Sequence, residues 1–150
     1  MADHSSEMKK KETPLEGQRF VINSDRDLVT IRDFGRKLGE KIGFQSNDRT
    51  LIATALSEVC RNVLEYAGSG EVRIEPVAQL KTKGMTITVT DTGPGIEDVE
   101  KALQEGFSTG RGMGLGLPGA KRIMDEFQIN SKIGNGTTVT MSKWLKNHEF

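Results

Sequence analysis

A carboxylate and a carboxamide stand four residues apart, at Glu58 and Asn62, in a stretch whose apolar residues recur at helical spacing. Side chains at this separation share one face of a helix. A carboxamide oxygen can ligate Mg²⁺, which prefers oxygen donors, and a nearby carboxylate can accept a proton from an attacking hydroxyl. The pair therefore fits phosphoryl transfer, although the same spacing also occurs on the solvated flanks of many helices.

Asp91 ends a strongly alternating segment and is followed at once by a turn that contains Gly93 and Gly95. A carboxylate in this position can accept a hydrogen bond from an exocyclic amine such as that of adenine. The glycines would let a flat ring approach the backbone, because they carry no Cβ. These residues predict a purine-binding turn, and an ordinary turn after a strand is the alternative.

Glycines occupy every second position before the last expected helix, at Gly110, Gly112, Gly114 and Gly116. The backbone amides of such a loop, together with the N-terminus of the helix that follows, suit a polyphosphate. The end of the loop also matches the dinucleotide pattern GxGxxG, but no strand precedes it, and the P-loop pattern fails because Ala120 stands where glycine is required. A mobile linker is the alternative, and the direct run into an amphipathic helix favours a phosphate loop.

The elements that must position these residues are strands and helices in a mixed order. The apolar periodicities predict strands at 19–23, 72–76, 85–91, 127–133 and 137–144, and helices at 24–43, 46–66, 97–105 and 116–127. Pro76 indicates an edge strand or an irregular finish, and Cys60 is expected on the side of its helix opposite the apolar arc. The sum predicts an α+β fold, a two-layer sandwich whose mixed, mostly antiparallel sheet is covered on one face by about three helices.

The length of 150 residues predicts a single domain, which we expect at 17–146 after a disordered tail at 1–16. The 21 basic and 21 acidic side chains cancel, which disfavours a general affinity for nucleic acid or for a membrane surface. One cysteine and the lack of an apolar signal segment predict a cytoplasmic protein. The two histidines, His4 and His148, lie near the ends, so a histidine-centred metal site is not expected.

Four segments in order, SEVCRN, DTGPG, GRGMGLGL and GNGTT, resemble the nucleotide-binding boxes of the GHKL superfamily of ATPases and kinases, which includes gyrase and the histidine kinases. The resemblance covers about residues 50–142. Within that superfamily the chain is similar to the small serine/threonine kinases of bacterial partner-switching pathways, the anti-sigma-factor and stressosome switch kinase type. The segments that carry this closer similarity are SEVCRNVLEYAGSG, EGFSTGRGMGLGLPGAKRIMDEF and the final KWL.

The resemblance implies a role for each matching residue. Asn62 would be the Mg²⁺ ligand and Glu58 the catalytic carboxylate, while Asp91 would recognise the adenine amine beside Gly93 and Gly95. The short lid and phosphate loop would comprise Gly110, Gly112, Gly114, Leu115 and Gly116. Thr137 or Thr138 would support the adenine beside Asp91, and the sequence does not distinguish between them.

The resemblance also implies an activity. The chain would be an ATP- and Mg²⁺-dependent protein serine/threonine kinase that phosphorylates a STAS-domain antagonist protein and binds a second partner, such as a phosphatase or a sigma factor. Glu65 stands where histidine kinases often carry a basic residue, which weakens an assignment to their subgroup. Autophosphorylation on histidine is not expected, because the sequence shows no long helical segment with a phosphoacceptor histidine. The alternatives are an ATP-gated binding module without turnover and an ATPase that transfers no phosphate; Glu58 favours the kinase, because nucleotide binding alone needs no proton acceptor.

Overall fold

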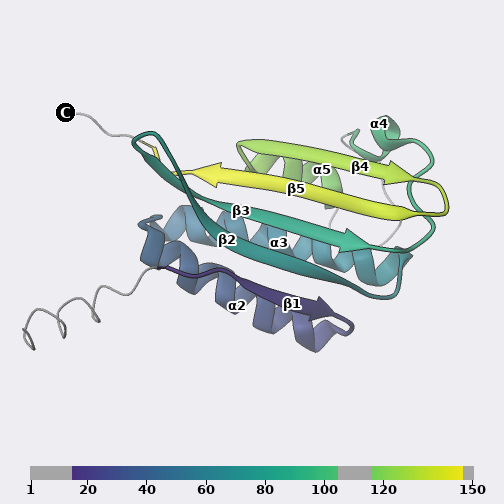
Figure 1. The fold of residues 1–150 in the computed structure, drawn as a ribbon, viewed down its shortest axis with the longest axis horizontal. Coiled ribbons are helices and arrows are strands. Elements are labelled where there is room, and N and C mark those ends of the chain that lie inside the picture. The colour runs from purple at the N-terminus through teal and green to yellow at the C-terminus, as the bar shows by residue number, and fades with distance from the viewer. Residues whose placement is uncertain (1–14, 105–115, 147–150) are drawn as a thin grey trace, which may run out of the picture.

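The structure, a computed structural model, describes residues 15–104 and 116–146 (Figure 1). The expected tail therefore lies almost entirely outside the described residues. The elements follow in the order β1 (Gln18–Ile22), α2 (Asp25–Ile42), α3 (Ser46–Tyr66), β2 (Gly70–Gln79), β3 (Thr82–Asp91), α4 (Val99–Ala102), α5 (Gly116–Ile123), β4 (Glu126–Lys132) and β5 (Gly136–Trp144).

The five strands form one sheet in the order β1-β2-β3-β5-β4, and each neighbouring pair is antiparallel. Helices α2, α3 and α5 lie on one face of this sheet, with α3 between the other two (Figure 1). The predicted α+β sandwich is confirmed, with a sheet that is antiparallel at every described pairing.

The core lies between the sheet and the helices. Alternate residues of the three inner strands are buried against the helices: Val72, Ile74, Met85, Ile87, Val89, Val139 and Met141. Their neighbours on the open face are mostly hydroxyl side chains, and Thr86 and Ser142 form a hydrogen bond across the strands at 2.9 Å. The period of two in these strands therefore separates a dry face from a polar one.

Local signals fix both ends of α2. The Asp27 carboxylate accepts hydrogen bonds from the backbone amides of Asn23 and Ser24 at 2.8 and 3.1 Å, which satisfies donors at the start of the helix. The helix ends at Gly43, whose φ of +121° favours glycine and whose amide donates to the Gly39 carbonyl. The predicted limits of this helix are confirmed.

The second helix differs from its prediction in what it buries. Cys60 was expected opposite the apolar arc, but it is fully buried. The reason is that α3 packs against α2 and α5 as well as against the sheet, so more than one of its faces is covered. Burial also raises the pKa of the Cys60 thiol to about 12.

Helices α4 and α5 and strand β2 also differ from the prediction. The last helix ends at Ile123 rather than at residue 127, because Glu126 already belongs to β4, and α4 is a single turn. Strand β2 is an inner strand, yet Pro76 lies beyond Ile74, the last residue that pairs with β1, so its missing N–H leaves no gap in that ladder.

None of the described helices combines the length and apolar character needed to cross a membrane.

Candidate functional site

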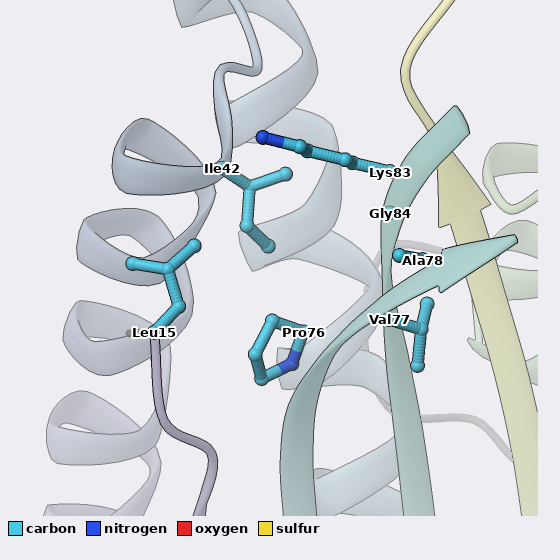
Figure 2. Close-up of a pocket in the computed structure, with 7 residues that line it drawn as sticks. All are labelled: Leu15, Ile42, Pro76, Val77, Ala78, Lys83 and Gly84. Carbon is cyan, nitrogen blue, oxygen red and sulfur yellow. The ribbon is translucent and has the colours of Figure 1, made fainter. Parts of the chain in front are cut away.

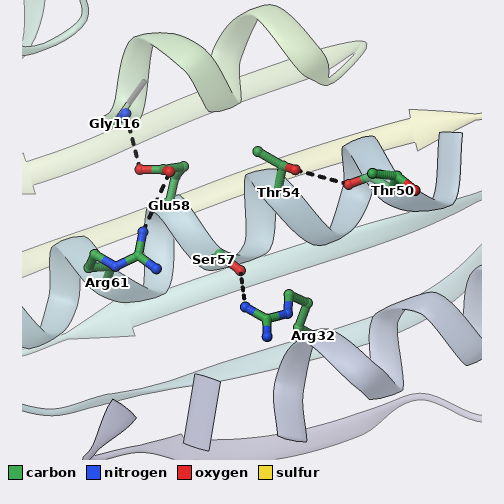
Figure 3. A network of polar contacts seen from close by, with 7 residues as sticks. All are labelled: Arg32, Thr50, Thr54, Ser57, Glu58, Arg61 and Gly116. Atoms are coloured by element: carbon green, nitrogen blue, oxygen red, sulfur yellow. Dashed lines mark hydrogen bonds and ion pairs between the residues drawn. The ribbon is translucent and has the colours of Figure 1, made fainter. Parts of the chain in front are cut away.

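Helix α3 brings Glu58 against the first residue of α5. The Gly116 amide donates to Oε1 of Glu58 at 3.1 Å, and only 16% of the glutamate side chain is exposed (Figure 3). These two predicted site residues are 58 positions apart in the sequence. A candidate proton acceptor therefore lies at the N-terminus of the helix expected to bind phosphate.

A residue that we did not predict for the site, Arg61, contacts the other oxygen of the same carboxylate. Its Nη1 lies 3.5 Å from Oε2 of Glu58, one helical turn away, and 42% of the arginine side chain is exposed (Figure 3). Pairs of this kind contribute only about 0.3–0.5 kcal/mol to stability. The signal in the sequence was a basic residue three positions after a carboxylate, which alone predicts only a surface ion pair.

Asn62 lies one turn beyond Glu58 and is half-buried. Within the described part of the chain, no hydrogen bond engages its carboxamide, and no three His, Cys, Asp or Glu side chains gather to hold a metal ion. An ion at Asn62 would therefore take further oxygen ligands from water and from phosphate, as Mg²⁺ does when it binds with a nucleotide. The Asn62 carboxamide oxygen therefore fits a Mg²⁺ ion that binds together with a nucleotide.

The side chain of Asp91, the last residue of β3, stabilises the turn that follows this strand. The Gly93 amide donates to Oδ1 of Asp91 at 2.8 Å, a local turn that aspartate favours. A Cβ at Gly93 would lie 2.6 Å from that of Ala67, and one at Gly95, whose φ is +85°, would meet the carbonyl oxygen of Lys132. Both glycines are thus required by the packing of the turn against the protein itself, a reason that the sequence did not reveal.

The two threonines that the sequence could not distinguish lie on opposite faces of the sheet. Thr137 pairs with Asp91 across β3 and β5, and it is buried on the side that the helices cover. Thr138 pairs with Thr90 and belongs to the open face. Thr137 is therefore the threonine that the structure places beside Asp91.

Ser131, which was not predicted, joins this end of the sheet to the turn after β3. Its Oγ lies 2.8 Å from Oγ1 of Thr137, and it accepts a hydrogen bond from the Ile96 amide at 2.7 Å. The Gly134 amide also donates to the Pro94 carbonyl at 2.9 Å. The Asp91 turn and the β4–β5 hairpin are thus fastened together.

Four predicted residues, Gly110, Gly112, Gly114 and Leu115, lie outside the described residues. Apart from Thr138, which lies on the open face of the sheet, the remaining predicted residues fall into two groups at neighbouring places. Glu58, Asn62 and Gly116 lie on α3 and α5, whereas Asp91, Gly93, Gly95 and Thr137 lie at the C-terminal end of β3 and the start of β5. The contact between Gly93 and Ala67 links the second group to the end of α3.

A cavity of about 250 Å³ lies at the opposite end of β3 (Figure 2). Its lining residues are Leu15, Ile42, Pro76, Val77, Ala78, Lys83 and Gly84. None of them belongs to the predicted site, and six of the seven carry apolar side chains or none. This cavity is therefore separate from the predicted nucleotide site.

Residues 22–143 match the model of the histidine kinase-like ATPase domain. The chain is 46% identical, over 83% of its length and 94% of the relative, to the serine/threonine-protein kinase RsbT of Bacillus subtilis (strain 168). It is 38% identical, over 63% of its length and 68% of the relative, to the anti-sigma F factor of Caldanaerobacter subterraneus subsp. tengcongensis. The solved Mycobacterial sensor histidine kinase MprB shares the fold, with a TM-score of 0.50 and 15% identity over 85% of this chain and 96% of that one. The chain belongs to the family of histidine kinase-like ATPase domains.

Proposed function

We propose that this protein is an ATP- and Mg²⁺-dependent protein serine/threonine kinase. The observation that carries the proposal is the position of Glu58, whose carboxylate lies against the N-terminus of α5. A proton acceptor at a phosphate-binding helix is what transfer to a hydroxyl needs and what nucleotide binding alone does not. The relative that bears the name serine/threonine-protein kinase supports the same reading, since it is 46% identical and almost fully covered.

In this mechanism the side chains of the site bind, orient and accept a proton. Asp91 accepts a hydrogen bond from the adenine amine, and Thr137 supports the base beside it. Asn62 would hold Mg²⁺, which offsets phosphate charge when bound. The substrate hydroxyl oxygen bonds to the γ-phosphorus, the bond to the oxygen bridging to the β-phosphate breaks, and the hydroxyl proton passes to Glu58.

The protein substrate is a STAS-domain antagonist, and a second partner such as a phosphatase or a sigma factor binds in alternation with it, in the cytoplasm. The resemblance to partner-switching kinases supports this assignment, and so do the relatives that are named anti-sigma F factors. The balance of 21 basic and 21 acidic side chains agrees with protein partners rather than nucleic acid.

The test is to incubate the protein with ATP, Mg²⁺ and a cognate STAS-domain protein and to map phosphorylated residues by mass spectrometry. Phosphoserine or phosphothreonine on the STAS protein supports the proposal, and its absence rejects it. Asn62→Ala should abolish transfer, because the variant loses the metal ligand. Asn130→Ala, an exposed position on β4, is the matched control and should leave transfer unchanged.

A second candidate is a binding module in which ATP occupancy changes the affinity for a partner without turnover. The relatives named anti-sigma F factors favour it, because such a name describes binding to a sigma factor. Measuring ADP release with and without the STAS protein separates the candidates. Partner-dependent ADP release with phosphate on the partner indicates the kinase, whereas ATP-dependent partner binding without ADP release indicates the module.

A further inference from the structure

The Glu58 carboxylate is held at both of its oxygens, and the two contacts come from different elements. Oε1 accepts the Gly116 amide of α5 at 3.1 Å, and Oε2 faces Nη1 of Arg61 on α3 at 3.5 Å (Figure 3). The first contact depends on how α5 is placed against α3. The second lies within α3 and does not depend on where α5 is placed.

If the protein binds ATP as proposed, the Glu58 carboxylate and a phosphate of the nucleotide would compete for the Gly116 amide. Backbone amides at the start of a helix donate to phosphate oxygens, and a carboxylate is an anion that occupies the same donor. ATP bound at α5 would therefore take the Gly116 amide and release Oε1 of Glu58. The contact with Arg61 would then be the one that still restrains the carboxylate.

We propose that Arg61 is a positioning residue, which holds Oε2 of Glu58 so that Oε1 points to the substrate hydroxyl during transfer. A guanidinium suits this task because it is permanently charged and presents its donors in a rigid plane. Among the described residues Arg61 is the cation paired with Glu58, whereas nearby Arg32 donates instead to the Ser57 hydroxyl at 3.4 Å (Figure 3). Because 42% of the Arg61 side chain is exposed, this ion pair adds little to stability. We therefore expect the loss of the pair to lower the rate of phosphoryl transfer.

The first test compares Arg61→Gln, Arg61→Lys and the control Arg36→Gln, which alters an exposed arginine on α2. Single-turnover transfer at saturating ATP and STAS protein gives the rate, and equilibrium titration gives the ATP Kd. We expect Arg61→Gln to lower the rate about 10- to 100-fold with a Kd within about threefold of the unaltered protein, since misplacement of a reacting group costs rate rather than binding. Arg61→Lys should recover part of the rate, and Arg36→Gln should change neither quantity.

The assignment is wrong if the Arg61→Gln rate stays within about twofold of the unaltered protein, or if its loss appears entirely in the Kd. It is equally wrong if Arg61→Lys is no faster than Arg61→Gln. A double-mutant cycle adds a stricter test. If Arg61 acts through Glu58, then Arg61→Gln should change the rate little in a Glu58→Gln background, and an equal loss in both backgrounds would contradict the proposal.

A readout that needs no transfer separates this inference from the kinase proposal. In the nucleotide-free protein, the NMR resonance of the Gly116 amide should move in Arg61→Gln toward its position in Glu58→Gln, because the carboxylate loses one of its two restraints. An unmoved resonance would contradict the role of Arg61. Lack of transfer by the unaltered protein, with the expected resonance shift present, would instead reject the kinase proposal and leave the restraint on Glu58 standing.

Discussion

The two ends of the sheet are stabilised by different kinds of interaction. At the C-terminal end of β3, hydrogen bonds fix the backbone, as between Gly93 and Asp91 or between Ile96 and Ser131. At the other end, apolar side chains surround a cavity next to Ile42. Hydrogen bonds place groups accurately but add little net stability, whereas apolar burial stabilises without directing. We therefore expect substitutions at the first end to change nucleotide binding and those at the second to change the free energy of unfolding.

The sharpest test of this division is Asp91→Asn. The substitution replaces one carboxylate oxygen by an amino group, which cannot accept a hydrogen bond from the adenine amine. Oδ1 can still accept the Gly93 amide, so the turn and the melting temperature should change little. We expect ATP binding to weaken by about 3 kcal/mol, roughly 150-fold, in a calorimetric titration. An unchanged ATP affinity would contradict the proposal that Asp91 binds the adenine amine.

At the other end, Ile42→Ala should have the reverse effect. The side chain is 6% exposed and borders the cavity, so its truncation removes apolar burial and enlarges a void. We expect a loss of about 2.5 kcal/mol in the free energy of unfolding by urea, with ATP affinity unchanged. Leu80→Ala is the control, since that side chain is fully exposed, and it should change neither property. A large loss of ATP affinity in Ile42→Ala would contradict the expectation that this end of the sheet affects stability alone.

Gly136→Ala tests whether the polar end also depends on close packing. A Cβ at this position would meet the Asp91 carbonyl oxygen and would lie 2.8 Å from Cα of Thr92, at a φ of +94°. We expect a loss of about 2 kcal/mol in stability together with weaker ATP binding, because Asp91 must shift. Gly134→Ala has a similar φ of +85° but open space around its Cβ, so it should cost only about 1 kcal/mol and leave affinity intact. Equal effects of the two variants would exclude the clash as the cause.

The smallest effect should distinguish Thr137 from Thr138. Thr137→Val removes the hydroxyl that pairs with Ser131 beside Asp91, and we expect ATP binding to weaken by about 1 kcal/mol. Thr138→Val alters the open face and should change affinity by less than about 0.5 kcal/mol. Titration of ATP into both variants decides the matter, and a greater loss in Thr138→Val would overturn the assignment of Thr137.

Much of the fold could be predicted because its signals are local. Asp27 and Gly43 mark the ends of α2 through caps that involve only neighbouring residues. The alternation from Met85 to Asp91 survives in β3, because one face of that strand is buried and the other is not. Signals of this kind depend on a few adjacent residues, so they can be read before any tertiary contact is known.

What could not be predicted depends on contacts between distant segments. Helix α5 stops early because Asp125, just before β4, bonds to β5: its amide donates to the Ser142 carbonyl, and its carboxylate accepts from the Trp144 amide. Cys60 is buried because α3 has neighbours on several sides. Glu58 and Asn62 could be found from their type and spacing, but the contacts of Glu58 with Gly116 and of Ser131 with Ile96 join segments that are far apart in the chain.

The burial of Cys60 makes the chain convenient for chemical labelling. It is the one cysteine of the sequence, it is fully buried, and its pKa of about 12 leaves almost no reactive thiolate at neutral pH. A maleimide dye would therefore react with a cysteine introduced by Leu80→Cys, at the fully exposed tip between β2 and β3, without any need to replace the native thiol. A fluorophore there would lie at the end of β3 opposite Asp91 and the predicted nucleotide site.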